Sequence, residues 1–215
     1  MGDQWQREPA AYDAINRNIE RILQSIQSIS PKHVTEYDYL VQNLQRAAET
    51  DYQKRYKRYW RLNGAGLSQN YCQRYFQYLQ FGQDGNVLDP GTLAYELYQI
   101  PINNNRRALQ FSFCTKLCHM LDRRLPIYDS NIRTFYAFKT PGYGLTVRQR
   151  IAQFMCFYQF LIAEYNRVLE GRLLHVSIQA FRQHFRPQHF TDIKVIDSLI
   201  WAWRQPANKP RRKGK

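Results

Sequence analysis

Three residues between positions 116 and 129 have side chains that can do chemistry together. Lys116 and His119 lie three residues apart in an apolar segment, and Asp129 follows a Pro-Ile-Tyr run where a further helix is expected to begin. The three-residue spacing places Lys116 and His119 on one side of a helix, so both can face one pocket. Lys116 would anchor a phosphate there or, if desolvated, act as an amine nucleophile. The alternatives are a solvated lysine, a hydrogen-bonded core histidine and an aspartate that only caps its helix.

The segment before these residues has the composition of a tight turn between two helices. It begins with Ile100-Pro101 and continues with three asparagines, which tolerate positive φ better than most residues other than glycine. Two arginines follow, so the turn is also basic. We regard these five residues as candidates for contact with DNA: Asn103, Asn104, Asn105, Arg106 and Arg107.

Taken together, the segment from Ile100 to Arg133 resembles the helix-hairpin-helix DNA glycosylase superfamily. In that family a Leu-Pro-Gly-Val-Gly type hairpin lies against DNA phosphates, and a Val-Asp-Thr-His-like segment downstream holds the catalytic aspartate. Here Tyr128-Asp129-Ser130-Asn131-Ile132 stands in the place of the aspartate segment. The helix before it is also similar to the S-F-A-T-K-L-x-H pattern of a bacterial subgroup, for which removal of phage-modified bases is a further expectation. The residues that match this pattern are Ser112, Phe113, Thr115, Lys116, Leu117 and His119.

The resemblance implies a compact all-helical fold, a nucleotide flipped out of double-stranded DNA, and no cofactor. Breaking an N-glycosidic bond builds positive charge on the sugar, and a desolvated carboxylate near the reacting carbon stabilises that charge. We therefore expect Asp129 and Lys116 to be catalytic and Tyr128 and His119 to line the base pocket.

The chain also departs from the family pattern. The hairpin glycines are absent, and no cysteine follows Cys156, so the family's four-cysteine iron–sulfur loop is missing. Arg106 and Arg107 stand where lyase-type members have a lysine, and arginine stays protonated and cannot form a Schiff base. We predict a monofunctional enzyme that hydrolyses the bond and leaves an abasic site.

The spacing of Cys114 and Cys118, next to His119, suggests metal ligands on a helix. A structural zinc site needs four placed ligands, and His184 and His189 are a poor match for the second pair. Buried small hydrophobic side chains are the better interpretation, so no metal site is predicted.

Basic residues dominate the charge of the chain. Lys and Arg outnumber Asp and Glu by 31 to 17, which gives a net charge of +14. Five cations lie in the segment 206–215, which we predict to be a disordered tail, and subtracting them from +14 still leaves +9. In the segment 51–62, cations alternate with aromatic residues, a composition that suits phosphates and bases. The further DNA-binding candidates are Lys54, Arg55, Lys57, Arg58, Arg123 and Arg124.

Helical periodicity runs through the whole sequence, so we predict an all-α fold. The expected helices cover residues 10–29, 32–48, 51–62, 67–81, a short stretch from 89 to before 101, 105–121, one opened by Asp129 or Ser130, 147–169, 177–184 and 192–204. The most persistent apolar stripe, from Val147 to Leu169, predicts the central core helix. We expect residues 1–205 to form one domain, in which two helical subdomains with a cleft between them are an option.

Four cysteines without a signal-peptide pattern favour a reducing cytoplasm, and no stretch is apolar enough to span a membrane. The alternative to a glycosylase is a noncatalytic helical nucleic-acid-binding protein in which Asp129 is only a cap. A third option, a membrane-surface or interaction protein, explains the charge but not the Pro-Ile-Tyr-Asp-Ser segment. No obligate protein partner is evident from the sequence.

Overall fold

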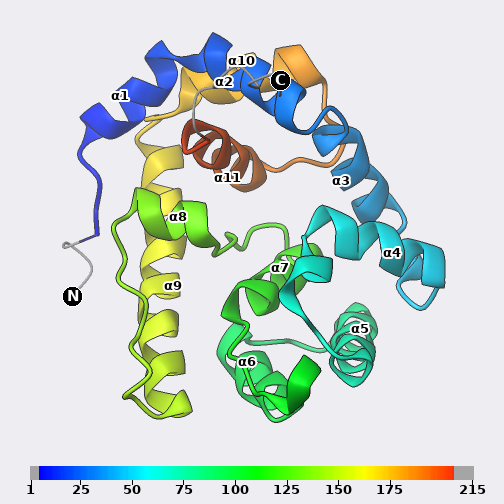
Figure 1. Ribbon diagram of the computed structural model, residues 1–215. Coiled ribbons are helices and arrows are strands. Elements are labelled where there is room, and N and C mark those ends of the chain that lie inside the picture. The colour runs from blue at the N-terminus through cyan, green and yellow to red at the C-terminus, as the bar shows by residue number, and fades with distance from the viewer. Residues whose placement is uncertain (1–4, 206–215) are drawn as a thin grey trace, which may run out of the picture.

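Helices make up the regular secondary structure of residues 5–205, the part of the chain that the computed structural model describes (Figure 1). Within this range no strand forms, and a single isolated antiparallel bridge joins Ile102 to Arg106. The all-α prediction is therefore confirmed, whereas the predicted tail, 206–215, lies outside the described residues. The helices are α1 Pro9–Arg17, α2 Ile19–Ile29, α3 His33–Gln42, α4 Thr50–Tyr59, α5 Gln69–Gln83, α6 Pro90–Tyr98, α7 Phe111–Leu121, α8 Ser130–Phe135, α9 Val147–Glu170, α10 His175–Phe185 and α11 Asp192–Trp203, with short 3₁₀ turns at Leu44–Arg46, Leu62–Ala65 and Asn103–Asn105.

Side-chain caps fix the start of several helices where the sequence predicts them. Asp89 accepts a hydrogen bond from the backbone N–H of Thr92 at 2.8 Å, and Pro90 occupies the first turn of α6. Thr146 and Gln149 form a reciprocal capping box at the start of α9. Each cap satisfies backbone donors that the first helical turn leaves unpaired.

Three expected helices differ from the structure. The helix expected over 32–48 ends at Gln42, and the 3₁₀ turn Leu44–Arg46 follows it. The helix expected over 10–29 is divided at Asn18, whose side chain donates to the carbonyl of Ala14 at 2.8 Å and competes with helical hydrogen bonding. The helix expected from Asn105 begins only at Phe111. The backbone N–H of Ile102 donates to the carbonyl of Arg106 at 2.7 Å instead, which closes a turn.

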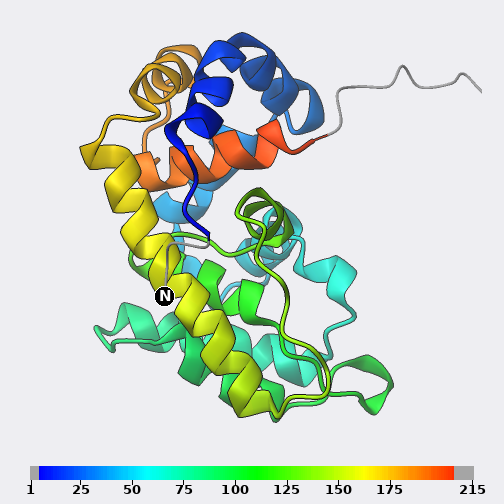
Figure 2. The same cartoon turned by 90° about the vertical axis from the view of Figure 1, so that its left-hand side faces the viewer.

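The helices form two groups that lie above and below one another in Figure 1. Helices α1, α2, α10 and α11 pack together in the upper group, and α5, α6 and α7 pack together in the lower one. Helix α9 runs alongside both groups, as Figure 2 shows from the side, and α8 contacts α11. The arrangement favours one domain with two subdomains.

Helix α11 is the most enclosed of these elements, which corrects the expectation that α9 is the central core helix. Nine of its 12 residues are buried, whereas α9 buries one face and leaves the other in solvent. An apolar stripe predicts one buried face, but it does not show how many neighbours a helix has. None of the described helices is both long and apolar enough to span a membrane.

Candidate functional site

A cavity of about 350 Å³ opens where the two groups of helices meet. Its wall is formed by the segment from the end of α2 to α3, the C-terminal end of α4, one residue of α7, the segment 127–132 and helix α11. The lining includes Lys116 and Asp129, so the fold brings together the two residues that the sequence predicts as catalytic. It also includes four aromatic rings, those of His33, Tyr59, Trp60 and Trp201.

Asp129 is both a helix cap and part of the cavity wall. Its Oδ1 accepts hydrogen bonds from the backbone N–H groups of Asn131 and Ile132, at 2.8 and 2.9 Å. Its other oxygen, Oδ2, makes no hydrogen bond to any described residue. The cap interpretation is therefore confirmed, and it does not exclude chemistry, because one oxygen holds the carboxylate in place while the other is left for a ligand.

Lys116 reaches the same cavity from α7. Its Nζ donates to the carbonyl of Trp60 at 3.3 Å and lies 5.0 Å from the ring centroid of Phe113. Burial lowers the pKa of Lys116 to about 8, and the nearby carboxylate of Asp129 opposes part of that shift. The side chain is therefore mostly an ammonium ion at pH 7, with a free-amine fraction that grows as the pH rises.

His119 and Tyr128 lie in the core and do not line the cavity, contrary to the expectation for a base pocket. Nδ1 of His119 donates to the carbonyl of Leu125 at 2.7 Å, so Nε2 accepts from the hydroxyl of Tyr37, also at 2.7 Å. Burial lowers the pKa of His119 to about 3, which keeps the ring neutral. Tyr128 packs among the rings of Phe111 and the phenylalanines around it. Both ring nitrogens of His119 therefore have hydrogen-bond partners within the core.

The asparagine turn between α6 and α7 has the backbone that the sequence suggests. Asn104 and Asn105 adopt positive φ of 61° and 52°, as the hairpin interpretation requires of residues that replace glycine. The backbone N–H of Asn103 donates to the carbonyl of Gly66, which ties the turn to the segment that follows α4. The side chains of the asparagines, Arg106 and Arg107 are exposed.

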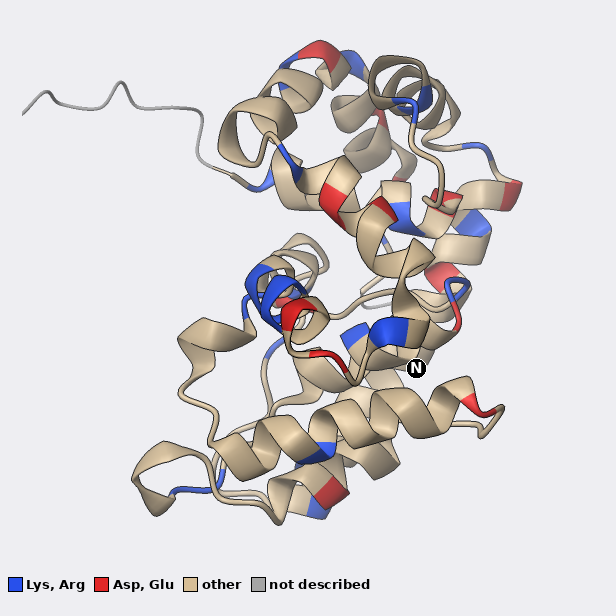
Figure 3. Cartoon of the chain, turned by 90° about the vertical axis from the view of Figure 1, so that its right-hand side faces the viewer, with Lys and Arg blue, Asp and Glu red and all other residues tan. Residues whose placement is uncertain are grey.

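Basic residues crowd α4, the helix with several blue turns left of centre in Figure 3. Arg55 is not free for DNA, because it makes two hydrogen bonds to Glu36, at 2.7 and 2.8 Å, and stacks on the ring of Tyr39. Arg58 is exposed at the cavity. Lys54 is exposed and pairs with Asp51 at 3.4 Å, and Lys57 is half-buried away from the cavity.

The other predicted cations lie elsewhere. Arg124 forms an ion pair with Asp122 at 2.8 Å, and Arg123 donates to the carbonyl of His189. At the cavity itself, Lys32 and Arg61 join Arg58 as exposed cations that make no ion pair with a described residue. Arg61 belongs to the segment 51–62 in which cations alternate with aromatic residues, although it was not among the DNA-binding candidates. Lys32 was not predicted, because it is an isolated cation in its part of the sequence.

Comparison with protein-family models, curated proteins and solved structures gave no match to this chain. The function of the cavity is therefore argued from its own residues.

Sequence reasoning missed the most unusual part of the cavity, the charged pair on α11. Lys194 and Asp197 are 4% and 5% exposed, on a helix whose other buried residues are apolar except Ser198. The sequence did contain an indication of this pair, namely two opposite charges three residues apart on the apolar face of a helix. Charged side chains are rarely buried unless they are paired or functional.

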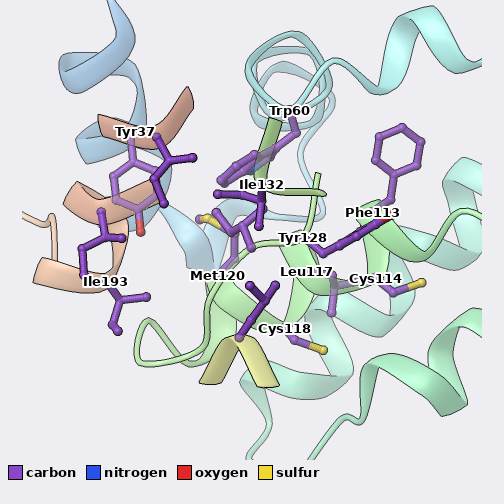
Figure 4. Close-up of a cluster of buried hydrophobic side chains, with 14 of the residues drawn as sticks. Tyr37, Trp60, Phe113, Cys114, Leu117, Cys118, Met120, Tyr128, Ile132 and Ile193 are labelled. Atoms are coloured by element: carbon purple, nitrogen blue, oxygen red, sulfur yellow. The ribbon is translucent and has the colours of Figure 1, made fainter. Parts of the chain in front are cut away.

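The cysteines of α7 serve as packing residues. Cys114 and Cys118 lie among buried hydrophobic side chains, as Figure 4 shows, and burial raises the pKa of both thiols. The interpretation as small hydrophobic residues is confirmed. Within residues 5–205, no group of three or more His, Cys, Asp or Glu side chains is arranged to hold a metal ion.

Proposed function

We propose that the chain is a DNA glycosylase that flips a modified or damaged base into this cavity and hydrolyses its N-glycosidic bond. The observation that carries the proposal is that a fixed carboxylate, Asp129, and a desolvated amine, Lys116, line one cavity with aromatic walls and exposed cations. Aromatic walls suit a flipped base, and the cations suit the phosphates on either side of it. The resemblance around Asp129 supports the same function, and a phage-modified base remains the expected kind of substrate.

In this proposal, Asp129 acts on the sugar. As the bond between C1′ and the base nitrogen breaks, its electron pair leaves with the base and positive charge builds on the sugar ring. The carboxylate, held by two backbone N–H groups, opposes that charge without needing to reorganise. It also orients the water whose oxygen bonds to C1′, while a proton from that water passes on to solvent.

Lys116 acts on the leaving base. An ammonium ion beside the departing nitrogen stabilises the negative charge that the electron pair brings, or donates a proton to it. The pKa of about 8 fits this role, because it keeps most of the side chain protonated at pH 7 while making it a better proton donor than a solvated lysine.

Product chemistry tests this assignment. If Lys116 works as an ammonium ion, no Schiff base forms, and strand breaks should appear only after alkali or heat. Sodium borohydride added during the reaction should leave no covalent adduct between protein and DNA on a denaturing gel. An adduct that is lost in Lys116→Met would instead show that the amine is the nucleophile and that the enzyme has a lyase step.

DNA binding should depend strongly on salt, because the cations displace counterions condensed on the phosphates. If roughly five phosphates are contacted, the slope of log affinity against log salt should be near −4.5. Replacing Lys32, Arg58 and Arg61 together with glutamine should bring the slope to about −1.8, at about 0.9 per phosphate lost. Fluorescence anisotropy with a labelled duplex at several salt concentrations measures both slopes.

A matched control uses three exposed cations that lie outside the cavity, Arg17, Lys139 and Arg204. Their replacement with glutamine removes the same net charge, so it should change the slope much less. Equal effects of the two triple variants would show that DNA is attracted by net charge alone and does not dock at the cavity. A flat salt response of the unaltered protein would contradict DNA binding as a whole.

A second candidate, a noncatalytic nucleic-acid-binding protein, is favoured by one observation. Asp129 has a complete structural role as the cap of α8, so its presence requires no chemistry. The same exposed cations would then bind DNA without base excision. The two candidates share the salt dependence and differ in whether a free base is released.

A further inference from the structure

The part of the cavity wall formed by α11 and the C-terminal end of α4 contains polar atoms that the protein itself leaves without partners. Among the described residues, five buried side-chain polar atoms have no hydrogen-bond partner, and three of them belong to residues of this cavity: the hydroxyl of Tyr59, Nε1 of Trp60 and Oδ2 of Asp197. Each such atom costs about 1–3 kcal/mol when it stays unpaired. Three at one cavity indicate a site built to hold a polar ligand.

Lys194 adds a fourth polar group without a conventional partner. Its Nζ lies over three rings, 5.3 Å from the centroid of Tyr37, 5.9 Å from Tyr59 and 5.0 Å from Trp60. It makes no ion pair with a described carboxylate. Burial lowers the pKa of Lys194 and raises that of Asp197, and each charge opposes the shift of the other. The rings hold the ammonium ion but leave its hydrogen-bond donors available.

Asp197 is held in place by its other oxygen. Oδ1 accepts a hydrogen bond from the hydroxyl of Tyr165 at 2.8 Å, and the backbone N–H of Ile127 also lies close enough to the carboxyl group to lower its pKa. Oδ2 has no hydrogen-bond partner of normal geometry. Trp60 is fixed as well: its ring contacts Tyr59 edge-on, and Figure 4 shows it beside Ile132 of α8. The Asp197 carboxyl group and the Trp60 ring are therefore held in place by their neighbours, and small side-chain movements expose their unpartnered atoms, each less than 1 Å² accessible, to a ligand.

The hydrogen-bonding chemistry of these groups specifies which edge of a ligand they recognise. Nε1 of Trp60 can only donate, and Lys194 only donates while it is protonated. Oδ2 of Asp197 accepts while it is ionised, and because burial raises the pKa of Asp197 to about 7, this form prevails above neutral pH. A complementary ligand edge presents a carbonyl oxygen beside a ring N–H. Keto nucleobases have this edge, whereas cytosine and adenine present an amino group and an unprotonated ring nitrogen instead.

We propose that Lys194, Trp60 and Asp197 form the base-recognition subsite and that it selects nucleobases with a carbonyl oxygen next to a ring N–H. The proposal rests on the proposed function, because it names the class of base that a glycosylase would excise here. Beside this wall, His33 stacks between Tyr59 and Trp201, with interplanar angles of 21° and 7°, and the stack gives the base a flat aromatic neighbour.

Binding of free bases tests this subsite without requiring catalysis. Ligand-observed NMR titrations of the full chain would use two matched pairs, 1-methyluracil against 1-methylcytosine and 9-methylhypoxanthine against 9-methyladenine, in which the methyl group blocks the ring nitrogen that carries the sugar in DNA. Within each pair only the edge changes, so the keto base should bind at least tenfold more tightly. Equal affinities within both pairs, or a preference for the amino bases, would overturn the proposal.

Two variants assign the selectivity to named atoms. Lys194→Met replaces the cation with a side chain that packs well on aromatic rings, and Trp60→Phe removes the Nε1 donor while keeping an aromatic ring. Each should remove most of the preference for keto bases, whereas Lys139→Met, at an exposed site outside the cavity, should keep it. If one variant fails to fold, as judged by thermal melting, the other variant still tests whether the subsite causes the preference for keto bases. A preference that survives in every folded variant of Lys194 and Trp60 would overturn the assignment.

Failure of this subsite and failure of the proposed glycosylase function give different experimental outcomes. Selective binding of keto bases without release of any base from DNA would leave a nucleobase-binding site on a protein that is not a glycosylase. Base release from DNA without selectivity for keto bases would leave the glycosylase and remove this subsite.

Discussion

Asp129→Asn should give a protein that folds and binds DNA but excises bases at least a hundredfold more slowly. The substitution removes the negative charge that opposes the developing sugar cation, at a cost on the order of 3 kcal/mol or more. Asparagine keeps the Oδ1 atom that accepts both backbone hydrogen bonds, so the loss of capping should be a few tenths of a kcal/mol, plus a modest charge–dipole contribution. Single-turnover excision rates, thermal melting and DNA affinity measure the three effects separately.

The chain offers a matched control in Asp89→Asn. Asp89 caps α6 in the same way as Asp129 caps α8, through a carboxylate oxygen 2.8 Å from a backbone nitrogen, but it does not line the cavity. Its variant should lose a similar amount of stability and no activity. If Asp129→Asn excises bases at the full rate, Asp129 is only a cap. If that variant does not fold, Asp129→Glu, which keeps the charge, provides the comparison.

Lys116→Met should lower the excision rate by about a hundredfold, the size of a typical contribution from general acid catalysis. Methionine has a similar length and should keep the packing against Phe113, so the fold should survive. Lys139→Met is the control for the loss of one positive charge, because Lys139 is exposed and outside the cavity. Single-turnover rates of the three proteins on the same duplex make the comparison.

The pH profile distinguishes the two possible roles of Lys116. Its pKa of about 8 means that the ammonium form is lost as the pH rises through this value. If the ammonium ion assists the leaving base, the rate should fall above pH 8, and this part of the profile should disappear in Lys116→Met. A rate that rises through pH 8 would contradict the ammonium role and indicate attack by the free amine.

Local patterns were enough to predict the residues that depend on local geometry. Asp129 lies at a helix start in a sequence typical of a cap, and the structure confirms that cap. Asn104 and Asn105 adopt the positive φ that an asparagine-rich turn suggests. Lys116 and Asp129 meet at one cavity because the helix and the connector between them span a short stretch of chain.

The remaining features depend on contacts that cross the fold. His119 accepts a hydrogen bond from Tyr37, which lies 82 positions away in sequence. The spacing between His119 and Lys116 therefore could not show that His119 is a core residue. The subsite joins Trp60, at the end of α4, to Lys194 and Asp197 on α11. Only the packing of α11 within the upper group of helices, where it faces the end of α4 across the cavity, makes two charges on an apolar helix part of a pocket.

The most direct test of the central claim is release of a free base from DNA. Purified protein would be incubated with genomic DNAs that carry different base modifications, including DNA of phages, and the small-molecule fraction would be analysed by mass spectrometry. The DNA itself would be treated with alkali to reveal abasic sites. We expect one class of modified DNA to yield free base and alkali-dependent breaks in equal amounts, with neither product from Asp129→Asn. Tight DNA binding with no free base from any of these DNAs would contradict the glycosylase assignment and favour the noncatalytic alternative.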